Sequence, residues 1–462
     1  MFRIIAAAAV LIALAAARCE ARPARAPESL VRAGGPEVIL EPVPGSGSVL
    51  AAVAVEAGSA WETPRTRGVT HLLEHLLFNG SERFSREDIS RWVDESGAFL
   101  NAFTRKETTV FFLLARRDLL EESLEILSQM LLHPLFVPRE IEKERAVVLE
   151  EIALARGSER GRRAVAADRF LYRGSPLAEP VLGYPATIEA ITREEIIAYH
   201  GERYDPRRMR IMLMGGFERE AALGWIDDYF TRANSARGAR PAGGEVRAAP
   251  STGRRAARGP GSAGRREDSG AAGADEPRWS GEVTHRPANG EPERLELLIK
   301  MPRPGERLFP AALVLADILA GDASPLAAAA REAGLAPPTA SLEVQRSFGA
   351  LRLVFEPGAS GGGEADSGAR AGGGLSGMPR VVAGLAGWVP EAETLETART
   401  AFVAAQIFDR ERFHYFVMRN GEAIALAGRE FLEALDAAGA VTTRDIGRLS
   451  EECFGRMRFN GV

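Results

Sequence analysis

Two histidines one helical turn apart, His71 and His75, are the residues of this sequence best suited to binding a metal ion. They stand in the pentapeptide His-Leu-Leu-Glu-His, in a chain that holds six histidines among its 462 residues. Residues four apart on a helix lie on one face, so both imidazoles would point toward the same ion. Two imidazoles suit a tetrahedral zinc, which still requires a third protein ligand. Since such motifs also arise by chance in structural helices, the pentapeptide gives a hypothesis that needs context.

Glu74 lies between the two histidines in sequence and flanks the same helix face. Zinc hydrolases leave one metal position to a water molecule, whose pKa the metal lowers toward neutrality. A carboxylate beside that water takes its proton and later passes it to the leaving amine. The motif therefore predicts peptide-bond hydrolysis through a metal-bound water, with Glu74 as the general base.

The order His-x-x-Glu-His is typical of the inverzincins, and the residues around it resemble the pitrilysin, insulysin and mitochondrial-processing-peptidase family. The resemblance covers residues 37 to 230 well and the remainder weakly. Three segments carry it: 68–80 around the motif, Asn-Ala-Phe-Thr at 101–104, and the Glu-rich stretch 144–152. It implies a zinc-dependent endopeptidase that acts on peptides or unfolded segments.

The third ligand lies in the Glu-rich stretch, where Glu144, Glu150 and Glu151 are all candidates from the residues alone. In the family the ligand follows the glutamate of a Glu-Arg pair by seven residues, which implies Glu151. Seven residues make about two helical turns, so Glu144 shares the face of Glu151 while Glu150 points about 100° away. The resemblance thus implies that His71, His75 and Glu151 hold Zn²⁺, with Glu144 as a supporting or substrate-side carboxylate behind them.

Substrate contacts are expected at Asn101 and Ala102, which the resemblance places on an edge strand beside the metal. An open edge strand binds an extended peptide through main-chain hydrogen bonds, although these residues also suit an ordinary hairpin. Family members carry an arginine and a tyrosine, seven residues apart, in the second half. Arg331 is the candidate arginine here, whereas a proline, Pro337 or Pro338, occupies the tyrosine position.

The fold class expected is α+β. Apolar alternation and turn residues predict strands over 37–40, 49–56, 108–114, 208–214 and 294–299, with helices between and after them. Residues 235–280 and 358–377 are rich in Gly and Ala and are expected to form a linker and a loop. The resemblance implies two similar α/β sandwich halves, each an antiparallel sheet with helices on one side, that close into a clam-like chamber.

Four regions are expected along the chain. Residues 1–26 read as a signal peptide, 35–234 as the metallopeptidase domain, 235–285 as a flexible linker and 286–462 as an inactive metallopeptidase-like domain.

The first region has a short basic start and then an apolar run from Ile4 to Ala17, which favours export to the periplasm or medium. A lipid anchor at Cys19 is disfavoured by Arg18, because lipoprotein signals require a small residue there. A mitochondrial presequence is the alternative, since arginines outnumber acids near the start.

The net charge of −5 gives no reason to expect a nucleic-acid partner. The expected partners are a peptide or unfolded polypeptide as substrate, and a second subunit. The missing tyrosine favours a homodimer, or a heterodimer with a metal-free subunit of the same family. The rival hypothesis is a non-catalytic or half-enzyme subunit of a processing-peptidase-like complex.

Overall fold

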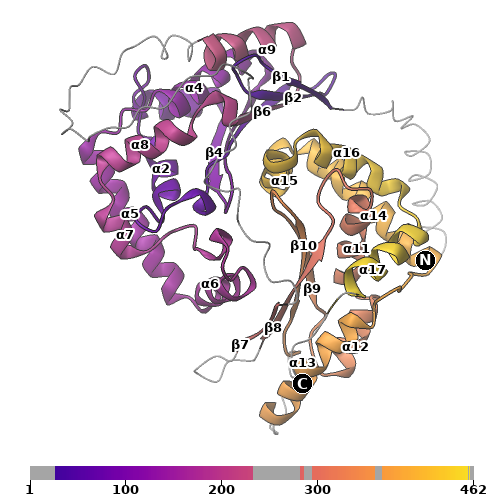
Figure 1. Ribbon diagram of the computed structural model, residues 1–462. Helices are drawn as coiled ribbons and strands as arrows, with labels where there is room; N and C mark the ends of the chain where they lie inside the picture. The colour runs from indigo at the N-terminus through magenta and orange to yellow at the C-terminus, as the bar shows by residue number, and fades with distance from the viewer. Residues whose placement is uncertain (1–26, 233–280, 286–293, 359–366, 456, 458–462) are drawn as a thin grey trace, which may run out of the picture.

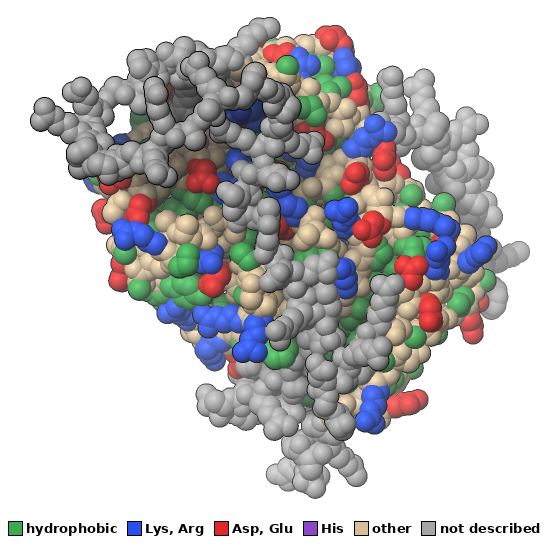
Figure 2. Space-filling view, viewed as in Figure 1, with side chains coloured by type: hydrophobic (Ala, Val, Ile, Leu, Met, Phe, Trp, Pro, Cys, Tyr) green, Lys and Arg blue, Asp and Glu red, His purple; other side chains and the backbone are tan. Residues whose placement is uncertain are grey.

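The chain folds into two α+β halves that lie side by side in the computed structural model, the first drawn from indigo to magenta and the second from orange to yellow (Figure 1). The structure describes residues 27–232, 281–285, 294–358, 367–455 and 457. The expected signal peptide, Cys19 and most of the expected linker lie outside these ranges. On the face seen in Figure 2, acidic and basic side chains are interspersed with apolar ones.

The first half is built on a six-stranded sheet in the order β1-β2-β6-β3-β5-β4. Its strands are β1 (Glu28–Val31), β2 (Glu37–Pro42), β3 (Ser48–Val55), β4 (Phe99–Thr104), β5 (Thr109–Arg116) and β6 (Met209–Gly215). All neighbouring pairs run antiparallel except β2 with β6, which run parallel, so the sheet is mixed. Strand β4 pairs with β5 alone and forms one edge of the sheet.

The helices of this half are α2 (Val69–Leu77), α3 (Arg86–Ser96), α4 (Leu120–Leu132), α5 (Pro138–Gly157), α6 (Glu159–Leu171), α7 (Pro185–Ala190), α8 (Arg193–Arg203) and α9 (Arg219–Ile226). Local sequence sets several of their ends. Helix α3 starts at a capping box between Ser85 and Asp88 and stops at Gly97 in a left-handed conformation. Helix α5 starts at a proline, whose missing N–H costs nothing at a first turn.

The second half has a four-stranded antiparallel sheet in the order β7-β8-β10-β9. Its elements are β7 (Gly281–His285), β8 (Arg294–Met301), α11 (Phe309–Ala320), α12 (Pro325–Glu332), β9 (Thr339–Val344), β10 (Gly349–Phe355), α13 (Ser367–Ala383), α14 (Ala392–Glu411), α15 (Phe413–Ala427), α16 (Arg429–Ala437) and α17 (Thr443–Phe454).

Two expectations for this half are wrong in part. Residues 281–285, expected to end the flexible linker, form β7 and pair with β8. The loop expected over 358–377 is a helix, α13, from Ser367 onward. Residues Phe309–Glu332 are long and apolar enough to cross a membrane by composition, yet they form α11 and α12, and just over half of their most apolar window is buried inside the molecule.

The two halves repeat one order of elements: a strand, two helices, then an antiparallel pair whose first strand is a sheet edge. In the first half these are β3, α2, α3, β4 and β5, and in the second β8, α11, α12, β9 and β10. The registers also correspond, because Thr104 faces Thr109 across β4 and β5 as Val344 faces Gly349 across β9 and β10.

Both faces of the first sheet are buried, each by a different half of the chain. Along β3, Val49, Ala51 and Val53 pack into the core formed with α2 and α4. Leu50 and Ala52 point the other way and pack with residues of the second half, including Phe416 of α15. A strand buried on both faces reads as a continuous apolar run, which is how β3 reads.

Helix α6 of the first half makes the reciprocal contact, with the sheet of the second half. Leu171 and Tyr172 at its end pack with Leu298 and Ala350 of the second sheet. Each half therefore covers a sheet face that belongs to the other.

Candidate metal centre

The helix that carries the histidines, α2, begins at a tight crossing of two backbones. Gly68 precedes it with φ +93°, and a Cβ there would lie 2.7 Å from the Leu182 carbonyl oxygen. The buried Glu62 carboxylate accepts hydrogen bonds from the N–H groups of Gly68 and Thr70, both at 2.8 Å. These are donors that a helix start leaves unpaired, so Glu62 caps α2 and anchors its first turn.

The structure brings the three expected ligand side chains together. His71 Nε2 lies 2.9 Å from Glu151 Oε2, and His75 Nε2 lies 3.8 Å from the same oxygen. His71 and His75 come from α2 and Glu151 from α5, and these two helices pack against each other. Glu150, exposed on α5, is not part of this cluster.

This arrangement fits a zinc ion. Tetrahedral bonds of 2.0–2.2 Å place ligand atoms about 3.4 Å apart, and the two separations to Glu151 Oε2, 2.9 and 3.8 Å, bracket that value. The potential ligand atoms of the three residues all lie within 4.8 Å of one another. Two imidazoles with one carboxylate are also a ligand set that catalytic zinc accepts.

Glu144 lies behind His75. Its Oε2 is 3.3 Å from His75 Nδ1, and its Oε1 accepts a hydrogen bond from Asn79 at 3.0 Å. A partner on Nδ1 fixes the orientation of the ring and leaves Nε2 facing Glu151. The geometry thus places Glu144 where a supporting carboxylate was expected.

The electrostatics of the cluster depend on His71. Burial disfavours its charged form, but the hydrogen bond to Glu151 and the nearby Glu74 carboxylate outweigh this and raise the pKa of His71 to about 9. The same hydrogen bond lowers the pKa of Glu151 below its usual value. A ligand histidine must be neutral, so a metal ion bound here would release that proton.

Glu74 lies beside the three ligand side chains and is not one of the group. Its Oε2 is 3.8 Å from His71 Nδ1 and accepts a hydrogen bond from the Thr104 hydroxyl at the end of β4. The side chain also lines a hollow of about 270 Å³ together with His75, Phe78 and Glu144.

Sequence models of two families match the chain. The insulinase family, peptidase family M16, matches residues 37–183, and the peptidase M16 inactive domain matches residues 190–350. The chain belongs to the M16 peptidase family. The first match contains all the residues of the cluster just described.

Relatives of this M16 chain include a protein of Mycobacterium leprae described as an uncharacterized zinc protease, 31% identical over 200 residues that cover 43% of this chain and 44% of the relative. The mitochondrial-processing peptidase subunit beta of Caenorhabditis elegans is 29% identical over 206 residues, covering 44% and 45%. In both cases the match spans less than half of the relative's length.

Solved structures show the same fold over nearly the whole chain. A protease from Helicobacter pylori superposes with a TM-score of 0.71 at 18% identity, covering 93% of this chain and 96% of that one. A peptidase M16 inactive domain from Pseudomonas fluorescens gives 0.70 at 16% identity, covering 92% and 94%. The expected α+β fold with two halves is confirmed.

The edge strand of the M16 fold, β4, carries the two expected substrate contacts. Ala102 N–H donates to the side-chain oxygen of Asn101 at 2.8 Å, so this N–H points away from β5 toward the open edge. A carbonyl of an extended peptide lying along β4 would take the place of the Asn101 oxygen.

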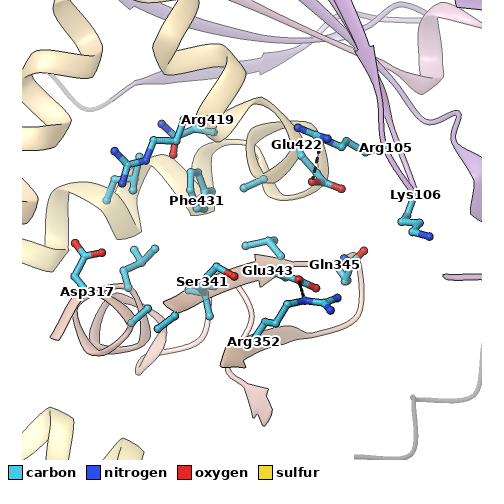
Figure 3. A pocket seen from close by; sticks show the side chains of 18 of the residues that line it. Arg105, Lys106, Asp317, Ser341, Glu343, Gln345, Arg352, Arg419, Glu422 and Phe431 are labelled. Carbon is cyan, nitrogen blue, oxygen red and sulfur yellow. Dashed lines mark hydrogen bonds and ion pairs between the residues drawn. The ribbon is translucent and has the colours of Figure 1, made fainter. Parts of the chain in front are cut away.

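A cavity of about 610 Å³ lies between the halves (Figure 3). Arg105 and Lys106 of the first half face Glu343, Arg352 and Glu422 of the second across it. Ion pairs bridge the cavity walls, with Arg105 3.9 Å from Glu422 and Arg352 3.2 Å from Asp168 of α6.

Arg331 is not brought to this cavity or to the cluster of histidines. It lies exposed on α12, where its guanidinium donates to the Asp322 carbonyl at 2.8 Å. Among the described residues, the arginines of the second half that line the cavity are Arg352 and Arg419.

Glu62 and Tyr199 were not among the expected site residues. The Tyr199 hydroxyl lies 2.6 Å from that of Thr70 beneath α2. Burial raises the pKa of Glu62 to about 7, although its backbone hydrogen bonds oppose the rise. Tyr199 reaches Thr70 from a distant segment, whereas Glu62 lies six and eight residues before its partners Gly68 and Thr70, outside the usual capping positions.

Proposed function

We propose that this M16 chain is a zinc-dependent endopeptidase that cleaves peptides or unfolded segments. The observation that carries the proposal is the convergence of His71 Nε2, His75 Nε2 and Glu151 Oε2 on one point, with Glu74 beside it. His71, His75 and Glu151 would hold the ion, and residues 35–234 would carry the chemistry. The second half, residues 286–462, would serve as the inactive counterpart.

Zinc bound there supplies a Lewis acid that polarises the scissile carbonyl and lowers the pKa of water. The chain supplies the proton transfer. Glu74 takes a proton from the water whose oxygen forms the new bond to the carbonyl carbon, and it gives that proton to the nitrogen as the C–N bond breaks. Glu144 holds the His75 ring in place throughout.

The substrate would be held as an extended strand on β4. Main-chain hydrogen bonds at Ala102, beside the Asn101 side chain, impose little sequence preference, which suits peptides of varied sequence. A folded protein presents few free backbone groups to such an edge, so unfolded segments are preferred.

A half-enzyme that needs a second subunit is the alternative. The position of Arg331, exposed and outside the cavity lining, favours it, since this side chain was expected to contact the substrate. Relatives include proteins named as the beta subunit of a peptidase, so a homodimer or a metal-free partner of the same family would complete the site. We also propose export directed by residues 1–26, which N-terminal sequencing of secreted protein would test.

The decisive experiment measures zinc content and cleavage of a quenched fluorescent peptide, with and without a candidate partner. Wild type should bind one zinc and cleave. Glu74→Gln should keep zinc and lose about 10²-fold or more of kcat, and Glu151→Gln should lose zinc. Glu150→Gln, on the adjacent exposed position of α5, should match wild type. Bound zinc without cleavage under any pairing would reject the peptidase and favour a non-catalytic subunit.

A further inference from the structure

The hydroxyl of Thr104 connects the open edge strand to Glu74. Thr104 is the last residue of β4, only 9% exposed, and its hydroxyl donates to Glu74 Oε2. Asn101 and Ala102 lie on the same strand, so the residue that holds the carboxylate and the residues that would hold substrate move together. This hydroxyl belongs neither to the candidate metal ligands nor to the expected substrate contacts.

The hydrogen bonds around Thr104 show which group receives its hydroxyl proton. Thr109, directly opposite on β5, places its hydroxyl 3.3 Å from that of Thr104. The single hydroxyl proton of Thr109 is donated to the Ala57 carbonyl at 2.9 Å. In its contact with Thr104, the Thr109 oxygen can then only accept, and the Glu74 carboxylate is the nearer of the two acceptors, so Thr104 donates to Glu74 Oε2.

The second half offers an internal comparison. The register positions that correspond to Thr104 and Thr109 hold Val344 and Gly349, which carry no hydroxyl. That half also shows no cluster of metal-binding side chains among its described residues. Valine suits the last position of the edge strand equally well, so strand formation does not require the Thr104 hydroxyl.

We propose that Thr104 is a positioning residue that determines which oxygen of Glu74 exchanges the proton. Its hydrogen bond occupies Oε2 and holds the carboxylate plane, which leaves Oε1 to act. The inference rests on the proposed peptidase function. In each turnover Oε1 gains a proton as the O–H bond of water breaks, and loses it as the N–H bond of the leaving amine forms, while Oε2 keeps its bond to Thr104.

The test compares Thr104→Val, which removes the hydroxyl at nearly constant shape, with Thr104→Ser, which retains it. Thr108→Val is the matched control, because Thr108 is buried in the same hairpin and its hydroxyl has no hydrogen-bond partner among the described residues. Zinc content, kcat and KM are measured separately for each variant.

We expect Thr104→Val to lower kcat about 10- to 100-fold, with zinc content unchanged and KM within about twofold of wild type. Thr104→Ser should recover most of kcat, and Thr108→Val should resemble wild type. An equal loss in Thr104→Val and Thr104→Ser, or a change confined to KM, would overturn the positioning role.

A crystal structure of Thr104→Val gives a second readout that does not depend on activity. The Glu74 carboxylate should occupy more than one orientation there and a single one in wild type. If wild type fails to cleave, the peptidase proposal fails by itself. A single unchanged Glu74 orientation in Thr104→Val would reject the inference about Thr104 instead.

Discussion

Each imidazole of the cluster is held from both sides by carboxylates. The Nε2 atoms of His71 and His75 face Glu151, while the two Nδ1 atoms face Glu74 and Glu144 respectively. The Nδ1 contacts differ in length, 3.8 Å to Glu74 and 3.3 Å to Glu144. Glu144 therefore contacts its ring more closely than Glu74 does.

Glu144→Ala should weaken zinc binding about 10- to 100-fold, because His75 loses the partner that sets its ring orientation. Titration with a competing chelator measures this affinity. Glu150→Ala, which truncates an exposed glutamate of the same helix, serves as control and should change little. Equal zinc affinity in Glu144→Ala and wild type would show that the ring needs no such support.

The three candidate ligands lie together as expected: helical spacing aligns His71 with His75, whereas the choice of Glu151 among three glutamates came from the family resemblance. Glu62 and the Thr104 hydroxyl were missed for a physical reason. Glu74 is brought to Thr104 by tertiary packing, which a local pattern does not encode. Glu62 precedes its partners Gly68 and Thr70 by six and eight residues, outside the positions that a capping pattern covers.

Among the elements, α2 depends most on a glycine. Gly68 combines a left-handed φ of +93° with a backbone oxygen 2.7 Å from where its Cβ would be. Gly183, on the loop it crosses, is under the same constraint, since a Cβ there would lie 2.4 Å from the Arg67 carbonyl oxygen.

Gly68→Ala should lower the free energy of unfolding by about 3 kcal/mol, combining left-handed strain with the clash. Gly45→Ala is the matched control, because Gly45 has φ +84° but nothing within 4 Å of its added Cβ. It should cost about 1 kcal/mol from strain alone. Urea unfolding of both variants measures the difference, and equal losses would mean that the crossing tolerates a methyl group.

The elements that sequence reasoning missed share a weak local signal. Helix α6 carries charged residues at nearly half of its positions, and its apolar end packs on the sheet of the other half, so its apolar periodicity is weak. Strands β9 and β10 were not identified at all. Helix α13 begins in a Gly-rich stretch whose composition favours a loop, and its helical form goes against glycine's low propensity.

At the scale of the whole molecule, the cavity between the halves contains Glu422, whose charged form is disfavoured by burial. Burial there raises the pKa of Glu422 to about 7, and Arg105 at 3.9 Å offsets only part of the rise. A carboxyl with a raised pKa stabilises the folded state most below its unfolded pKa, near 4.5. This stability is lost as pH rises through about 7.

Glu422→Gln should therefore gain stability over wild type as pH rises. We expect the difference in melting temperature between variant and wild type to increase by roughly 2–4 °C from pH 5 to pH 8. Thermal unfolding at both values tests this, with Glu411→Gln on the exposed end of α14 as control. A constant difference across this range would mean that Glu422 stays ionised in the folded state.

The crossing of α15 onto the first sheet separates two constraints on the second half. Helix α11 contributes nothing to the candidate metal group found among the described residues, and most of its side chains are buried in the core. Phe416 and Val417 of α15, by contrast, lie against the sheet that supports the helix of His71 and His75. Arg210 of that sheet donates to the Ile424 carbonyl at the end of α15 at 3.0 Å. The second half can therefore lack the proposed metal site and still provide packing that supports the first sheet.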